Sequence, residues 1–294
     1  MSIIRYGAAV WGDKEFSCIN AVHNRMCRYY LGVNKFTPNA AIQGDMGVRV
    51  PWQHQKLEIA RQWCRLVNMS DSRVNKKIFK WANGFTCKNW TSRAKNFFNL
   101  CQRDVYTAVN NIDKKDFMDD MHECIEKIFV EKWLAIVNKV ESRKKNGKNK
   151  LRTYCTLKST FCSEKYVYNI LPKSHRGALA QFRSGTAPIR LETGRYEGLP
   201  VEERICFVCK NCVESELHVL IECPLYNEIR SLLFSKLQMH YRNFYVFSKK
   251  EQMKCILACE DDVLVKECAK ACHDILSLRR TQLYVLINSI MEYM

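Results

Sequence analysis

Apolar residues recur every three or four positions along most of the chain, and the alternation typical of strands is scarce. In 51–69, for example, Leu57, Ala60, Cys64 and Val67 fall on one stripe of a helix. The pattern therefore predicts a mainly α fold. Other helices are expected over 15–31, 72–83, 90–101, 114–140, 175–184, 225–240, 248–259 and 261–292.

Turn and capping residues set the ends of several of these helices. Gly32 suits the C-terminal cap of the first helix, and Ser248 with Glu251 forms a capping box that begins another. The segment 33–50 contains Thr-Pro-Asn and Gly-Asp-Met-Gly, so we expect a loop there. Within 15–31 the expected apolar stripe consists of Phe16, Ile19, Val22, Met26 and Tyr29.

A basic run over 142–152 interrupts the helical pattern and predicts a linker between two regions. We expect a first helical region over 1–141 and a second over 153–294. The whole chain has a net charge of +17, and residues 132–210 hold 17 Lys/Arg against 6 Asp/Glu. Such a charge attracts polyanions, of which nucleic acid is the usual candidate.

Four residues of the second region have the spacing of a closed zinc site. Cys206 and Cys209 lie two residues apart, and His218 and Cys223 follow within a short predicted helix. Zinc prefers four nitrogen or sulfur ligands in a tetrahedron, and four protein ligands leave no position for water. The spacing therefore predicts a structural zinc ion, Zn2+, within a small CCHC segment, 204–226. Cys212 is an alternative to one of these ligands.

Other Cys and Asp groups have a structural interpretation beside the functional one. Cys255/Cys259 and Cys268/Cys272 have helical spacing, which is typical of a small apolar stripe, although facing helices can build a second metal site from them. Asp119 and Asp120 follow Phe117-Met118, as in the aromatic-x-Asp-Asp box of reverse transcriptases. Their flanks have helical spacing, which places both carboxylates on the solvent face of a helix. No catalytic residue is predicted.

Basic and aromatic residues alternate between the linker and the CCHC segment, a composition typical of single-strand nucleic-acid binding. A solvated helix face with core aromatics such as Phe182 explains the same pattern. The candidate nucleic-acid-binding residues are Arg143, Lys144, Lys145, Lys148, Lys150, Arg152, His175, Arg176, Arg183, Arg190, Arg195 and Arg204.

The 16 cysteines bear on the compartment. The N-terminus lacks the apolar segment of a signal peptide, so we expect an intracellular protein, nuclear or cytoplasmic, with reduced thiols. No apolar run approaches the ~20 residues of a membrane span, and no membrane partner is predicted.

Several short sequence motifs resemble those of one protein family. Arg183-Ser-Gly185, Glu192-Thr-Gly-Arg-Tyr196 and Cys223-Pro-Leu-Tyr226 are similar to the C-terminal zinc-binding region of LINE-type (non-LTR) retrotransposon polyproteins. Tyr6-Gly-Ala-Ala-Val-Trp-Gly12 and Leu31-Gly-Val33 resemble the region that follows their reverse transcriptase palm. The resemblance covers nearly the whole chain. It implies a helical connector followed by a zinc knuckle, without the polymerase active site or the endonuclease.

The resemblance implies that Cys206, Cys209, His218 and Cys223 are the zinc ligands and that the region binds nucleic acid. We therefore expect a non-enzymatic, zinc-containing protein that binds RNA or single-stranded DNA. Two alternatives stay open: a helical protein-interaction module with a purely structural zinc site, and a remnant without selected function.

Overall fold

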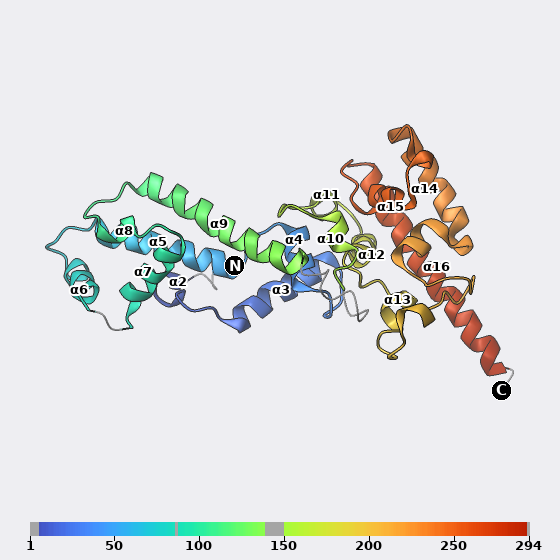
Figure 1. Ribbon diagram of the computed structural model, residues 1–294, viewed down its shortest axis with the longest axis horizontal. Helices are drawn as coiled ribbons and strands as arrows, with labels where there is room; N and C mark the ends of the chain where they lie inside the picture. The colour runs from blue at the N-terminus through green and yellow to red at the C-terminus, as the bar shows by residue number, and fades with distance from the viewer. Residues whose placement is uncertain (1–5, 86–87, 139–149, 293–294) are drawn as a thin grey trace. The chain divides into compact units, whose positions relative to one another are not determined.

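The computed structural model describes residues 6–85, 88–138 and 150–292 (Figure 1). These residues are mainly helical, as predicted, and their single β pairing is an isolated antiparallel bridge between Ile205 and Val213. None of the described helices combines the length and apolarity needed to cross a membrane.

The chain divides into two compact units, and the division differs from the expected one. The first unit comprises Met1–His23 and Arg49–Trp133, and the second comprises Asn24–Val48 and Leu134–Met294. The segment between residues 24 and 48 thus belongs with the C-terminal region. Most of the predicted linker, 142–149, lies outside the described residues.

The first unit has a core of aromatic rings around one tryptophan. The Trp63 ring lies edge-on to Phe79 and Phe98, with centroids 5.0 and 5.2 Å apart. The stripe predicted for 51–69 is buried, as expected. The helices of this unit are α2 (Ala8–Trp11), α5 (Pro51–Val67), α6 (Val74–Asn83), α7 (Trp90–Leu100), α8 (Val105–Ala108) and the greater part of α9 (Lys114–Asn138).

Helix α9 forms where a helix was predicted, over most of 114–140. Its Phe117, Met121, Ile125 and Trp133 side chains are buried, whereas Ile136 is exposed.

Helix α3 (Ser17–Leu31) forms where expected, but the predicted buried stripe is wrong. Met26 and Tyr29 are half or more exposed, and Cys27 and Leu31 are buried instead. The reason is tertiary packing, because Cys27 and Leu31 join the core of the second unit, which is built mainly from residues after position 160. The tyrosine ring lies under a cation, since the Nζ atom of Lys173 is 3.4 Å from the Tyr29 centroid.

The second unit contains a helix where a loop was predicted. Helix α4 (Asn39–Met46) follows Pro38 and ends at Gly47, whose φ of 57° closes the helix in the left-handed conformation. The Gly and Asp residues read as turn formers, Gly44 and Asp45, are buried inside this helix.

A long C-terminal helix, α16 (Leu264–Glu292), organises the rest of the second unit, and α12 (Lys173–Arg183) and α14 (Asn227–His240) pack against it. The capping box of Ser248 and Glu251 is present, as predicted. The α-helices after the linker are α10 (Tyr154–Leu157), α11 (Lys165–Tyr168), α12 (Lys173–Arg183), α13 (Arg190–Thr193), α14 (Asn227–His240), α15 (Lys249–Leu257) and α16 (Leu264–Glu292). Short turns complete them: η2 (Val201–Glu203), the π turn η3 (His218–Glu222), η4 (Pro224–Tyr226) and η5 (Phe244–Val246).

Candidate metal centre

A tight loop presents the first two cysteines of the CCHC segment. The loop is closed by hydrogen bonds from Cys206 N–H to Cys212 O (2.9 Å) and from Glu214 N–H to Arg204 O (2.9 Å). Lys210 takes a positive φ of 56°, which turns the chain back after Cys209. This tight loop therefore brings the thiols of Cys206 and Cys209 close together.

The other two residues come from the π turn η3 and its end. His218 begins the turn and Cys223 follows it, before Pro224 begins η4. The π turn is one residue wider than an α-helical turn, so the His218 carbonyl oxygen accepts a hydrogen bond from the N–H of Cys223 at 2.8 Å. This closure aims both side chains at the cysteine loop.

The four predicted residues converge. One ligand atom from each of Cys206, Cys209, His218 and Cys223 lies within 4.8 Å of all the others. The Sγ atoms of Cys206 and Cys223 are 3.9 Å apart, and Cys209 Sγ is 3.4 Å from His218 Nε2. A zinc tetrahedron with bonds of about 2.3 Å to sulfur and about 2.0 Å to nitrogen has edges of roughly 3.5–3.8 Å. The side chains thus form a Cys3His cluster that can hold a metal ion.

Burial sets the ionisation of these ligands. Cys206, His218 and Cys223 are buried, and Cys209 is half-buried. Desolvation raises the pKa of Cys206, raises that of Cys223 to about 12, and lowers the pKa of His218. Buried thiols stay protonated when no cation is near. A divalent metal ion that binds the cluster displaces these protons and stabilises the resulting thiolates.

Cys209 differs from the other thiols. Burial opposes its ionisation, but hydrogen bonds from Asn211 N–H and from the Cys206 and Cys212 side chains outweigh that effect and lower its pKa. The Cys209 thiol is therefore the one that ionises most readily and meets an incoming ion as a thiolate.

Cys212 lies on the other side of the imidazole. Its Sγ atom is 3.1 Å from His218 Nδ1, and Glu222 Oε2 is 3.6 Å from the same nitrogen. Nε2 therefore faces Cys209, while Nδ1 faces Cys212 and Glu222. Cys212, His218 and Glu222 form a second, three-residue group of possible ligands that shares the histidine.

Two buried glutamates fix the CCHC segment to the rest of its unit. Glu214 accepts hydrogen bonds of 2.7 Å from both Nε and Nη2 of Arg279 on α16, and Glu216 pairs with Arg152. A bidentate arginine–carboxylate pair fixes the relative orientation of the two side chains in addition to neutralising their charges. The loop and the π turn are thus positioned by the helical scaffold.

Two of the basic residues predicted to contact nucleic acid are buried. Arg183 has no exposed surface and pairs with Asp45 and Glu164. Arg204 donates to the carbonyls of Leu191 and Leu199. Their guanidinium groups are occupied inside the protein, so the expectation that they contact phosphates is wrong. A sequence pattern does not distinguish an internal arginine from an external one.

Three others surround a buried carboxylate. Lys150, Arg152 and Arg195 have cationic atoms 3.6, 3.9 and 2.7 Å from the carboxylate oxygens of Glu192. The Glu192 carboxylate neutralises part of the positive charge of this cluster. Each of the three cations is half-buried, so the cluster is also partly open to solvent.

The remaining candidates lie nearer the surface. Arg176 stacks on Tyr30, and Arg190 lies over the Phe207 ring at 4.9 Å. His175 is half-buried with its ring 4.8 Å from His273, and desolvation, with the nearby His273, lowers its pKa. At neutral pH His175 is therefore uncharged. Arg143, Lys144, Lys145 and Lys148 lie outside the described residues.

Sequence reasoning missed an exposed aromatic group near these cations. Phe36 and Tyr196 are more than half exposed, with ring centroids 6.5 Å apart. Lys35 Nζ and Lys150 Nζ lie 5.1 and 5.6 Å from the Phe36 centroid. We call Lys35, Phe36, Lys150, Arg195 and Tyr196 the aromatic face. Lys35 and Phe36 lie more than a hundred residues away in sequence from Lys150, Arg195 and Tyr196, and no sequence signal links the two groups.

The alternative sites have structural explanations. Asp120 accepts a 2.6 Å hydrogen bond from Arg103 and a 3.1 Å bond from the hydroxyl of Tyr106, and these bonds connect α9 to α8 and to the residues just before it. Asp119 is exposed. In the described part of the chain Cys255, Cys259, Cys268 and Cys272 do not assemble a metal-ligating group, and the last three are buried.

Comparisons with known proteins give no further identification: no family model, no curated protein and no solved structure matches this chain.

Proposed function

We propose that the Cys3His cluster binds one zinc ion. The donor set supports this choice, because three thiolates and an imidazole are the ligands that zinc takes in closed structural sites. The cluster edges of 3.9 and 3.4 Å fit the same ion. The ion would hold the cysteine loop against the π turn. Since all four positions are protein side chains, the proposed role of the ion is structural. We propose separately that the protein is non-enzymatic.

We further propose that the second unit binds single-stranded nucleic acid, RNA or DNA, on the aromatic face. Exposed rings stack on bases without regard to sequence, and adjacent cations contact the phosphates. The single observation that carries this proposal is the exposed Phe36–Tyr196 pair with Lys35, Lys150 and Arg195 over the two rings.

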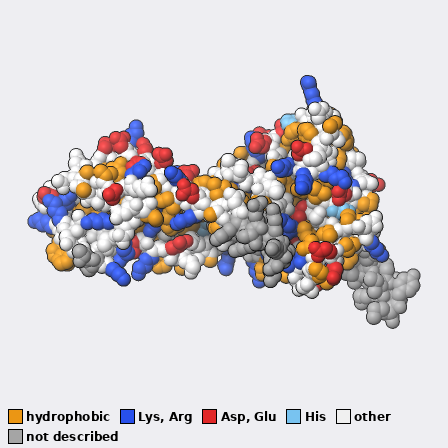
Figure 2. All heavy atoms as spheres, in the orientation of Figure 1, with side chains coloured by type: hydrophobic (Ala, Val, Ile, Leu, Met, Phe, Trp, Pro, Cys, Tyr) orange, Lys and Arg blue, Asp and Glu red, His pale blue; other side chains and the backbone are white. Residues whose placement is uncertain are grey.

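Net charge alone would not select this face. Figure 2 shows cationic side chains interspersed with acidic ones on the side of the molecule that it draws. The aromatic face combines two exposed rings whose centroids are 6.5 Å apart with three cations that lie over them. The resemblance to the zinc-binding region of LINE-type retrotransposon polyproteins favours the same function, and we propose that the chain derives from such a region.

A titration with fluorescent oligonucleotides tests the proposal. The zinc-loaded chain is mixed with single-stranded RNA and DNA 12-mers at 50 mM salt, and polarisation is measured. We expect micromolar binding that weakens steeply as salt rises, because phosphate contacts release counterions. Phe36→Ala and Tyr196→Ala should each weaken binding by about tenfold, since one stacked base contributes about 1–3 kcal/mol.

Tyr245→Ala provides the matched control. Tyr245 is also more than half exposed in the second unit but lies outside the aromatic face. Its loss should leave affinity within a factor of two. If neither RNA nor DNA is retained at low salt, or if all three variants bind alike, the proposed nucleic-acid function is wrong. Specific capture of a protein by the zinc-loaded chain would then favour the interaction module.

A further inference from the structure

A buried arginine borders the Cys3His cluster. Arg230 lies in the first turn of α14, seven residues after Cys223, and only 5% of its surface is exposed. Its Nη2 atom donates to the carbonyl oxygen of Cys223 at 2.6 Å and also to the side chain of Asn227. The arginine therefore holds the backbone of one of the four candidate ligands.

One nitrogen of this arginine has no acceptor. Within the described residues the buried Nη1 atom of Arg230 makes no hydrogen bond, and the guanidinium group pairs with no carboxylate. A buried donor without an acceptor and a buried cation without an anion are both costly to a folded protein. The environment of Arg230 therefore lacks an anion that accepts hydrogen bonds.

The other buried arginines of the described chain do not share this feature. Arg183 and Arg279 pair with carboxylates. All three side-chain nitrogens of Arg204 donate to backbone carbonyl oxygens. Among these buried arginines, Arg230 alone retains a buried nitrogen without an acceptor.

The carboxylate of Glu222 does not supply the missing anion. Glu222 precedes Cys223 in sequence, but one of its oxygens is 2.7 Å from the Nζ atom of Lys249. Its other oxygen is 3.6 Å from Nδ1 of His218. Both oxygens thus face groups other than the arginine.

Metal binding would create an anion next to Arg230. Three thiolates carry one negative charge more than a zinc ion neutralises, and a neutral imidazole adds none, so a loaded Cys3His cluster is an anion. Cys206, His218 and Cys223 are buried, so water screens this charge poorly. Groups that hydrogen-bond to metal ligands tune the affinity of the metal. The guanidinium group has the charge and the free donor that such a cluster requires.

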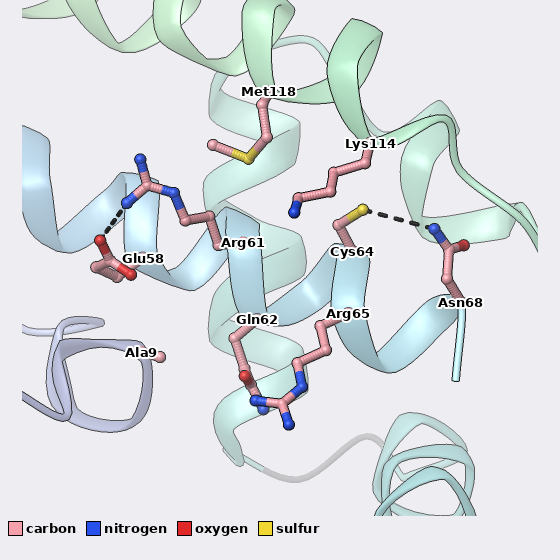
Figure 3. A pocket seen from close by; sticks show the side chains of 9 residues that line it. All are labelled: Ala9, Glu58, Arg61, Gln62, Cys64, Arg65, Asn68, Lys114 and Met118. Atoms are coloured by element: carbon pink, nitrogen blue, oxygen red, sulfur yellow. Dashed lines mark hydrogen bonds and ion pairs between the residues drawn. The ribbon is translucent and has the colours of Figure 1, made fainter. Parts of the chain in front are cut away.

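Exposed cations elsewhere do not call for a bound anion. Figure 3 shows three of them, Arg61, Arg65 and Lys114, around an open cavity of about 450 Å³ in the first unit. All three are exposed, so water solvates their charges, and Arg61 also pairs with Glu58. The burial of Arg230 is what distinguishes it from these cations.

We propose that Arg230 is a positioning residue of the metal centre, which holds Cys223 by its carbonyl oxygen and neutralises the excess negative charge of the loaded cluster. This role depends on the proposed zinc site. Arg230 does not bind the ion itself. Its charge becomes favourable only when the metal is present, because the thiols of the metal-free cluster are largely protonated.

Competition with a chromophoric chelator measures the zinc affinity of charge variants of the full chain. Arg230→Gln keeps an amide donor but loses the charge, and should weaken zinc binding by about tenfold or more, as is usual when an outer partner of a metal ligand is lost. Arg230→Lys keeps the charge and should stay within about threefold of the original. Arg242 is an exposed arginine just after α14, so Arg242→Gln should change the affinity less than about twofold.

Urea unfolding of the metal-free and the zinc-loaded chain separates this role from a purely structural one. An arginine that only packs and donates to the backbone would stabilise both forms equally. We expect Arg230→Gln to lower the unfolding free energy of the zinc-loaded form by the larger amount. At saturating free zinc the excess should equal the change in affinity, about 1.4 kcal/mol for a tenfold loss.

Cobalt(II) in place of zinc gives a readout at the sulfur atoms. The d–d bands of tetrahedral cobalt report the ligand geometry, and the sulfur-to-cobalt charge-transfer band reports the charge around the thiolates. In Arg230→Gln the d–d bands should persist while the charge-transfer band moves to lower energy, because thiolate electrons rise in energy when a neighbouring cation is removed. Arg230→Met is also neutral and replaces Arg230→Gln if that variant does not fold.

Three results would overturn the proposal, and they can be told apart. If the original chain binds neither zinc nor cobalt, the proposed metal site is wrong and the role of Arg230 is wrong with it. If the original chain binds zinc and the neutral variants bind it equally well, only the role of Arg230 is wrong. Equal destabilisation of the metal-free and zinc-loaded forms, with an unshifted charge-transfer band, would make the arginine purely structural.

Discussion

Asp45 and Arg183 form a buried, two-pronged ion pair within the second unit. The Nε and Nη2 atoms of the arginine lie 3.0 and 2.9 Å from the two carboxylate oxygens, and the Tyr166 hydroxyl donates to the same aspartate at 2.6 Å. The pair joins α4 to α12, which are 138 positions apart in sequence. Burial opposes the charge of Arg183, but Asp45 and Glu164 outweigh it and raise its pKa.

Breaking this pair should be costly. In Asp45→Asn the amide no longer neutralises the guanidinium, and a buried charge without its partner costs about 3–5 kcal/mol. Because Glu164 also lies 3.1 Å from Arg183, we expect a loss near the lower end, about 3 kcal/mol, measured by urea unfolding. Asp262→Asn is the control: it removes an exposed ion pair with Lys165 and should cost less than about 1 kcal/mol. Equal losses would contradict the assigned role of the buried pair.

The same pair shows where sequence reasoning succeeds and where it fails. Helix positions follow from local spacing, so α5, α9, α12 and α16 could be predicted. The partner of a helix face is a long-range property. The Gly-Asp-Met-Gly segment resembles a turn in isolation, yet tertiary packing makes it the buried helix α4.

The candidate site divides in the same way. The spacing of Cys206, Cys209, His218 and Cys223 is short-range and sufficient to predict the cluster. Whether an arginine is buried in an ion pair or exposed to solvent depends on carboxylates that are distant in sequence. The sequence alone therefore could not distinguish the buried Arg183 from the arginines at the surface. The aromatic face escaped prediction for the same reason, since Phe36 meets Tyr196 only through tertiary structure.

Two glycines allow a close approach of α3 and α12, and one of them should not tolerate a side chain. A Cβ atom placed on Gly177 would lie 2.5 Å from the carbonyl oxygen of Gly32, whose own φ is +73°. Gly177→Ala must therefore separate two backbones, and we expect a loss of about 1–3 kcal/mol.

Thermal unfolding measures this loss, and Gly84→Ala supplies the comparison. A Cβ at Gly84 would lie 3.5 Å from the carbonyl oxygen of Trp81, an ordinary van der Waals contact, and this residue has a negative φ. Gly84→Ala should thus leave the unfolding temperature nearly unchanged. A similar shift for both variants would show that the approach of α3 and α12 is not tight.

Acid should weaken the second unit partly through His175. Its folded pKa lies below the ordinary value, chiefly because of desolvation, with a further contribution from His273. As pH falls below about 6.5, the unfolded chain binds the proton first, so the stability present above that pH is lost as pH passes through the lowered folded pKa.

His175→Gln removes this titration, and its unfolding free energy should fall less than that of the original chain between pH 7 and pH 5. Urea unfolding at several pH values measures the difference. His240→Gln is the control, because His240 is exposed. A pH profile of His175→Gln that parallels the original would exclude His175 as a source of acid sensitivity.

Metal content should separate the two groups of ligands that share His218. Native mass spectrometry of the reduced chain should show one zinc ion. Cys206→Ser and Cys223→Ser remove buried ligands and should abolish it, whereas Cys212→Ser, on the Nδ1 side, should retain one ion. Glu222→Gln leaves the four ligands intact but removes the carboxylate facing Nδ1, so we expect zinc to bind about tenfold more weakly in competition with a chelator. Retention by Cys206→Ser together with loss in Cys212→Ser would instead place the ion in the group of Cys212, His218 and Glu222.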